Sequence, residues 1–156
     1  MKNQQGFTLI ETLIYLALFG IIMGGVGVVA YAVIEAAGRG QTRITMQEEG
    51  DFLFGKLNWA LAGASNATVT PSSLEIKKFG YPIPLVFNAS GTKLNINEGA
   101  GPIDLNSDAV DVSIIFIDIP ALNGRPEGVI ASATLTSLTP RGTAISQSFQ
   151  TTKYLR

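Results

Sequence analysis

Residues 12–34 have the sequence TLIYLALFGIIMGGVGVVAYAVI, and this stretch decides the fold. It contains no charged residue and no proline. About 20 such residues are enough for a helix to cross the hydrocarbon core of a bilayer. The stretch therefore predicts one unbroken helix that spans a membrane.

Glycine is frequent within this stretch, at positions 20, 24, 25 and 27. Each glycine costs about 1 kcal/mol relative to alanine in a water-exposed helix, whereas in a membrane or a bundle small residues let helices approach closely. Gly20 and Gly24 have the small-xxx-small spacing and are candidate helix-packing residues. Ordinary glycine usage in a membrane helix explains the pair equally well.

The helical pattern continues beyond the apolar stretch but becomes one-sided. Residues 35–64 contain no proline, and acidic and basic residues lie outside an apolar stripe. The stripe recurs at three- and four-residue steps and consists of Met46, Gly50, Leu53, Leu57, Ala60, Leu61 and Ala64. This predicts an amphipathic helix that ends near residue 63 and needs a partner surface. A helix over 7–63 is about 85 Å long, too long for a domain of this size to enclose its first half.

From Thr70 onward the sequence has the texture of β-structure. Runs rich in Val, Ile, Thr and Phe are separated by turn residues such as Asn123-Gly124 and Pro140-Arg141-Gly142. Short turns predict an antiparallel meander, packed on the apolar stripe, with residues 110–119 as a central strand buried on both faces near its end. The expected strands are 74–79, 85–88, 93–97, 110–119, 129–138 and 145–155. The predicted fold class is α+β.

Composition limits the chemistry. The 156 residues allow one domain, charged residues make up 15%, and the net charge of −1 gives no basic footprint for nucleic acid. Without histidine or cysteine, the chain cannot form a Ser-His-Asp triad or a zinc site with imidazole or thiolate ligands. Asp104, Asp108 and Asp111 form a weak set of oxygen ligands, but solvated turn residues are the favoured interpretation. We expect no cofactor, no metal site and no enzymatic activity.

The first eleven residues connect these features. A short polar head is followed by GFTLIE at positions 6–11 and then by the apolar stretch. This pattern resembles the class III signal of type IV prepilins and type II secretion pseudopilins. The resemblance implies a long helix packed on a sheet, cleavage by a membrane-embedded aspartyl prepilin peptidase between Gly6 and Phe7, and N-methylation of Phe7.

The resemblance also implies that Glu11 pairs with the amino terminus of a neighbouring subunit. An unpaired carboxylate is costly in apolar surroundings, and an ammonium partner relieves that cost. The alternative is that Glu11 only marks the interfacial end of the span.

The implied organisation has three parts: a leader over 1–6, a transmembrane and filament-core helix over 7–35, and an extracytoplasmic head over 36–156. The implied partners are the prepilin peptidase and methyltransferase, other pilin or pseudopilin subunits, an inner-membrane assembly platform, and membrane lipid before assembly; no nucleic acid is expected directly. The amino terminus would be cytoplasmic and the assembled filament extracellular or periplasmic. A pilus, a secretion pseudopilus and a DNA-uptake pseudopilus all fit.

Departures from the principal subunits suggest a minor role. The apolar stretch lacks proline, the chain lacks a cysteine pair, and no acidic calcium loop is evident near its end. The chain is similar to the minor group that includes type II secretion protein J, which predicts a place in filament initiation or at the tip.

Other classes of protein remain as alternatives. Ala30-Tyr31-Ala32 resembles a conventional signal-peptide cleavage site and would give a secreted or membrane-anchored binding domain. The apolar run, however, exceeds the 7–15 residues of a signal-peptide core. An anchored hydrolase that uses carboxylates, and a single-span anchor unrelated to pili, are the further alternatives.

Overall fold

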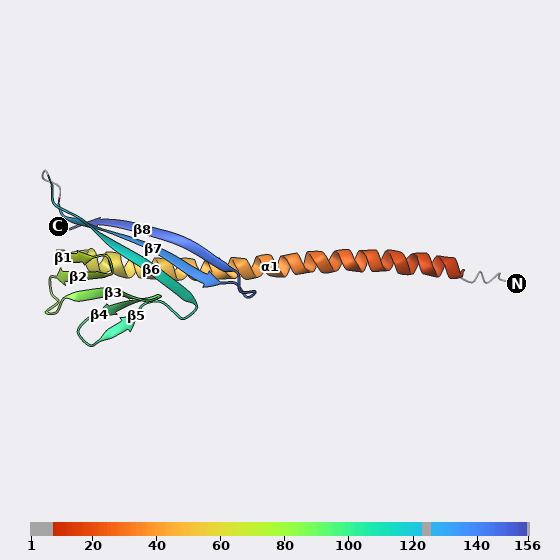
Figure 1. Ribbon diagram of the computed structural model, residues 1–156, viewed down its shortest axis with the longest axis horizontal. Helices are drawn as coiled ribbons and strands as arrows, with labels where there is room; N and C mark the ends of the chain where they lie inside the picture. Colours follow the sequence, from red (N-terminus) through yellow and green to blue (C-terminus); the bar gives the residue numbers. More distant parts are fainter. Residues whose placement is uncertain (1–7, 123–125, 156) are drawn as a thin grey trace. The chain divides into compact units, whose positions relative to one another are not determined.

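The computed structural model describes residues 8–122 and 126–155 as one long helix and two antiparallel sheets (Figure 1). By contact, the chain divides into two compact units, residues 1–40 and residues 41–156. The elements in chain order are α1 (Leu9–Leu61), β1 (Ala64–Thr70), β2 (Ser73–Lys78), β3 (Leu85–Ser90), β4 (Lys93–Asn97), β5 (Pro102–Asp104), β6 (Val110–Ile119), β7 (Gly128–Leu138) and β8 (Ala144–Tyr154). The predicted α+β class is confirmed.

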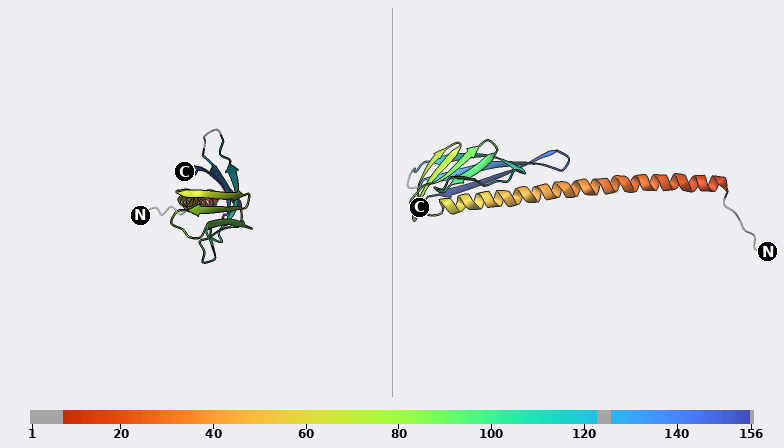
Figure 2. Two further views of the ribbon diagram at one scale, coloured as in Figure 1. Left: turned by 90° about the vertical axis from the view of Figure 1, so that its left-hand side faces the viewer. Right: turned by 90° about the horizontal axis from the view of Figure 1, so that it is seen from below.

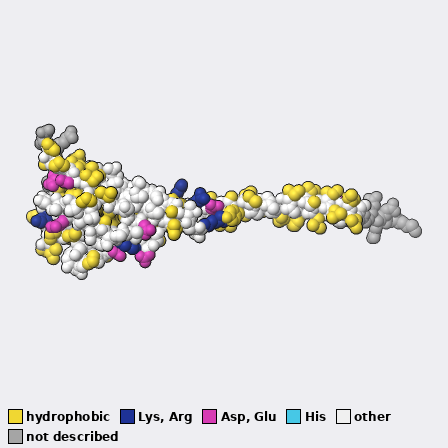
Figure 3. All heavy atoms as spheres, in the orientation of Figure 1, with side chains coloured by type: hydrophobic (Ala, Val, Ile, Leu, Met, Phe, Trp, Pro, Cys, Tyr) yellow, Lys and Arg dark blue, Asp and Glu magenta, His cyan; other side chains and the backbone are white. Residues whose placement is uncertain are grey.

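The first unit consists, in its described part, of helix alone. Every side chain over residues 12–34 is exposed among the described residues. Figure 3 shows apolar side chains spread over this part of α1. By length and composition, α1 is able to cross a membrane. Exposure of such a surface to water is unfavourable, whereas contact with lipid or with neighbouring helices is favourable.

In the second unit, α1 continues as the predicted amphipathic helix. The seven residues of the apolar stripe are all buried, as are Thr42 and Phe54. Glu48 and Asp51 are exposed on the other face. The helix ends at Leu61, and Gly63 follows with a φ of 80°, the left-handed conformation in which glycine commonly terminates helices. Ala64 is therefore the first residue of β1 rather than part of the helix.

The carboxyl end of α1 is held by Lys78, the last residue of β2. Lys78 Nζ donates a hydrogen bond to the backbone oxygen of Trp59 at 2.6 Å and lies 4.2 Å from the centre of the Trp59 ring. Tyr81 meets the same ring edge-on, with 5.8 Å between ring centres. A cation at the carboxyl end of a helix also interacts favourably with the negative end of the helix dipole.

The first sheet has five strands in the order β1-β2-β3-β4-β5, all antiparallel. Strands β1 and β5 were not expected. Strand β1 is polar, and the pair Ser65-Asn66 suggests a break; in the structure these residues form a register shift at the start of the strand. Strand β5 is only three residues long and begins with Pro102.

The second sheet has three antiparallel strands in the order β6-β7-β8. The expectation that residues 110–119 form a central strand buried on both faces is wrong. β6 lies at the edge of its sheet, and Ile115 and Ile117 are about half exposed. The free edge of β6 instead receives the turns of the first sheet: Phe116 N donates to Pro71 O at 3.2 Å, and Val112 N donates to Thr92 O at 2.9 Å.

The expected meander is thus divided between two sheets, and both pack on the stripe of α1. Figure 2 shows the strands on one side of this part of the helix. The core is a single cluster drawn from α1 and both sheets, and its largest fully buried members include Met46, Leu53, Leu57, Leu74, Phe87, Phe116 and Leu135.

Candidate functional site

The amino-terminal start of α1 is the first part of the candidate site. Gly6 and Phe7 lie outside the described residues. Thr8 precedes the helix, and its Oγ1 accepts a hydrogen bond from Glu11 N at 3.3 Å. This is half of a capping box, in which a Thr at the helix cap is followed three residues later by Glu. The Thr-x-x-Glu spacing in the sequence could have revealed this cap.

Glu11 has a local partner that sequence reasoning missed. Its side chain is partly buried, and Tyr15 Oη donates to Oε1 at 3.1 Å. Residues four apart lie on the same helix face, so the pair could have been found from spacing alone. Within residues 8–122 and 126–155, Glu11 Oε2 accepts no hydrogen bond. Glu11 can therefore accept a further donor, such as an ammonium group, while it keeps the tyrosine.

Gly20 and Gly24 lie on open helix surface. A Cβ added at either position would meet no atom within 4 Å of the described chain, and the same holds for Gly25 and Gly27. Gly20 and Gly24 are four positions apart, so they lie on one helix face. No residue within 8–122 or 126–155 packs on this face at the two glycines, so a partner that does would be another molecule.

An ion pair follows the apolar stretch. Arg39 Nη2 lies 2.6 Å from Glu35 Oε1, one helical turn apart. Both side chains are partly exposed, so the pair contributes only a few tenths of a kcal/mol. Residues 12–34 span about 35 Å of helix, against about 30 Å of bilayer hydrocarbon. The charged residues Glu11 and Glu35 therefore flank a segment that is long enough to span a membrane.

In the head, Asp104, Asp108 and Asp111 do not come together as ligands. No group of three acidic residues able to hold a metal ion occurs in the described part of the chain. Asp108 instead pairs with Lys93, whose Nζ lies 2.6 Å from Oδ1. This hydrogen bond, and the charge of Lys93, lower the pKa of Asp108 below its ordinary value.

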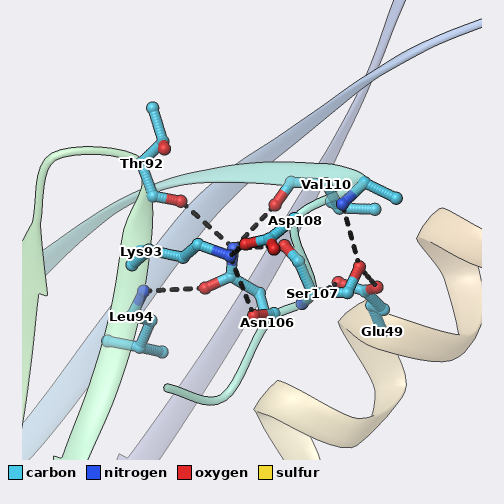
Figure 4. Close-up of polar contacts among 9 residues, drawn as sticks. Glu49, Thr92, Lys93, Leu94, Asn106, Ser107, Asp108 and Val110 are labelled. Carbon is cyan, nitrogen blue, oxygen red and sulfur yellow. Dashed lines mark hydrogen bonds and ion pairs between the residues drawn. The ribbon is translucent and has the colours of Figure 1, made fainter.

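Asn106 holds the loop that contains Asp108, and sequence reasoning missed it. The residue is buried, and its Nδ2 donates to Val110 O at 2.6 Å and Thr92 O at 3.1 Å. Its Oδ1 accepts from Leu94 N at 2.9 Å (Figure 4). One amide thus joins the segment before β6 to the turn between β3 and β4.

The same loop is also tied to α1. Glu49 accepts hydrogen bonds from the backbone N and the Oγ of Ser107 (Figure 4). These contacts join parts of the head to one another, because every partner belongs to the same chain. They leave the amino-terminal segment as the part whose features the fold does not use.

The comparisons with known proteins agree with this division. Residues 1–27 match the model of the prokaryotic N-terminal methylation motif, the class III signal of type IV pilins. No curated protein and no solved structure matches the chain. The resemblance predicted from GFTLIE is thus confirmed for the motif over residues 1–27, whereas the minor subgroup and the roles of Gly6, Phe7, Glu11, Gly20 and Gly24 stay predictions.

Proposed function

We propose that this chain is a minor subunit of a type IV pilus or a type II secretion pseudopilus, with a mechanical rather than an enzymatic role. One observation carries the proposal. The methylation motif over residues 1–27 leads directly into an apolar helix whose side chains are all exposed from residue 12 to residue 34. A surface of this kind needs lipid before assembly and other helices after it.

The proposed course begins with processing. The precursor sits in the inner membrane with its amino terminus in the cytoplasm. A prepilin peptidase cleaves between Gly6 and Phe7, so that 1–6 is the leader, and Phe7 is then N-methylated. The assembly platform would move helix 7–35 from lipid into the filament core and leave residues 36–156 outside it.

Glu11 is the proposed assembly residue. Its open Oε2 atom suits the ammonium of Phe7 on a neighbouring subunit. Phe7 and Glu11 are four positions apart, about 6 Å along a helix, which would set a short axial step between subunits. Gly20 and Gly24 are the proposed packing residues, since they would let a neighbouring helix approach closely.

The minor role is supported by what the sequence lacks. It has no proline within the apolar stretch and no cysteine pair. A subunit related to type II secretion protein J would act in filament initiation or at the tip.

Intact-mass analysis of the full chain, purified from a host that expresses a prepilin peptidase, tests the proposal. The mature chain should begin at N-methyl-Phe7. Gly6→Phe should leave the precursor uncut, whereas Gly25→Ala, a matched change within the helix, should be processed normally. A chain that begins at Val33 would instead support the conventional signal peptide.

A further inference from the structure

The two sheets have four edges, and three of them are protected. β1 has a register shift at its start, β5 is short and begins with proline, and β6 receives the turns of the first sheet through backbone hydrogen bonds. Bulges, short strands, proline and coverage are the means by which proteins prevent unwanted pairing at a sheet edge.

The fourth edge, that of β8, has none of these protections. The strand is 11 residues long, contains no proline and pairs with β7 without a register shift. Its one charged residue, Lys153, lies next to its end. Among the described residues, no strand and no backbone hydrogen bond occupies its other edge (Figure 1). An edge of this length and regularity is a template for another strand.

Two hollows lie between α1 and β8. The first is lined by Arg43, Ile44 and Gln47 of the helix and by residues 145–147 of the strand. The second is lined by residues 61–63 and 152–154. β7 lines neither hollow, so both open on the free side of β8. Phe149 separates them, with its ring stacked on Phe54 at 5.8 Å between centres.

Each hollow has a cation at its rim. Arg43 lines the first and Lys153 lines the second. Neither has an ion-pair partner within the described residues. The side chains that point away from the helix between them, Ser146, Ser148, Gln150 and Thr152, are uncharged. The edge is thus neutral in the middle and positive at both ends.

We propose that the free edge of β8 accepts an extended segment of a partner protein, uncharged in its middle and acidic at both ends. The backbone of the segment would continue the sheet, and its two carboxylates would reach the hollows. The hollows are centred about seven residues apart along the strand, roughly 24 Å. Two carboxylates six or eight residues apart would lie on the same face of the incoming strand.

A partner with carboxylates suits this edge better than a second copy does. Two β8 strands paired in parallel would bring Lys153 next to Lys153. Paired antiparallel about Phe149, they would place Lys153 opposite Ile145 and supply no acid to either hollow. Repulsion of this kind disfavours the wrong partner. The site lies wholly in the second unit and stands apart from the proposed role of the amino-terminal segment.

The test uses the full chain in detergent and a labelled peptide of nine residues, Glu-Thr-Val-Thr-Val-Thr-Val-Thr-Glu, with binding followed by fluorescence anisotropy. Arg43→Glu and Lys153→Glu should each weaken binding about three- to tenfold at low salt. Lys77→Glu, the same charge change on an exposed residue of β2, should leave binding within about twofold. A peptide with Lys at both ends should bind wild type weakly and the double variant better.

Methylation of alternate peptide nitrogens separates strand pairing from simple attraction of charges. Successive N–H groups of a strand point to opposite edges, so methylation on one edge should abolish binding and methylation on the other should preserve it. Equal binding of the two methylated peptides, no binding of the parent peptide, or dimerisation of the chain through β8 would each overturn the proposal.

Discussion

Gly50 lies where α1 meets the edge strand β8, and replacing it tests how the head is packed. A Cβ built on Gly50 would lie 2.6 Å from Cε1 and 2.7 Å from Cε2 of Phe149. Ordinary contacts of this kind begin at about 3.5 Å. Gly50→Ala therefore requires the Phe149 ring to move by about 1 Å, and with it the stacking on Phe54.

Two opposing effects decide the outcome. Alanine is favoured over glycine in a helix interior by about 1 kcal/mol. Overpacking of a well-filled site costs about 1–3 kcal/mol. Because the ring lies against the backbone at Gly50, we expect the packing cost to exceed the helical gain and the net loss of stability to be about 1 kcal/mol.

Gly55 is the matched control. It lies in the same helix, is exposed, and has no atom within 4 Å of an added Cβ. Gly55→Ala should keep only the helical gain and stabilise by up to about 1 kcal/mol. Phe149→Leu should reduce the cost of Gly50→Ala when the two are combined, because the shorter side chain leaves room.

The assay is urea unfolding of the full chain in mild detergent, followed by near-UV circular dichroism and Trp59 fluorescence. Relative to wild type, Gly50→Ala should lower the free energy of unfolding and Gly55→Ala should raise it. If Gly50→Ala stabilises the head as much as Gly55→Ala does, the ring does not occupy the position on which this reasoning depends.

Asn106→Ala should lower the free energy of unfolding by about 3 kcal/mol, since it leaves buried backbone groups unpaired, whereas Asn88→Ala, at an exposed side chain of β3, should change it by less than about 0.5 kcal/mol in the same urea assay. Because Lys93 lowers the pKa of Asp108, the carboxylate stabilises the fold above its ordinary pKa of 3.8, and this contribution is lost as the pH falls below that value; wild type should lose more stability than Asp108→Asn over this range, and added salt should shrink the difference. A chain that begins at residue 36 should be soluble and folded by circular dichroism, whereas one that begins at residue 63 lacks the buried stripe of α1 and should aggregate; equal stability of the two would show that the stripe is not the core. Glu11→Leu should stay in the membrane and still be cut after Gly6 but enter filaments poorly, as measured by fractionation, precursor mass and filament content, and normal incorporation would leave Glu11 a purely interfacial residue.

The helix could be predicted from the sequence because its two halves have strong and different patterns. A charge-free run needs no knowledge of its neighbours, and the stripe at Met46, Leu53 and Leu57 repeats with the helical period. Alternation and turn residues predicted β2, β3, β4, β6, β7 and β8. β1 was missed because its residues are polar, and β5 because three residues are too few for a period to appear.

The division into two sheets could not be predicted, because it depends on contacts distant in sequence. Asn106 reaches Thr92 and Leu94, and Val112 bonds to Thr92, so the edge of β6 is occupied by turns rather than by a neighbouring strand. Alternation within residues 110–119 shows which side chains share a face, but it does not show which edge is covered. Ile115 and Ile117 share the exposed face of β6, although their apolar side chains favoured a strand buried on both faces.

The candidate site divides in the same way. Gly6, Phe7 and Glu11 could be singled out because they lie within one short linear motif, which is read from the sequence without knowledge of the fold. The features of the β8 edge could not, because Arg43 and Lys153 are 110 positions apart and meet the same strand edge only after folding. In the first unit, the apolar surface of the exposed helix would be better solvated by lipid or by other helices than by water. In the second unit, the open edge of β8, with a cation at each end, favours association with other chains and so lowers solubility. One proline in the strand would prevent this, as Pro102 does at β5. The contrast between the protected edges and the open one is the physical reason to look for a partner at β8, separate from the partners that the apolar helix requires.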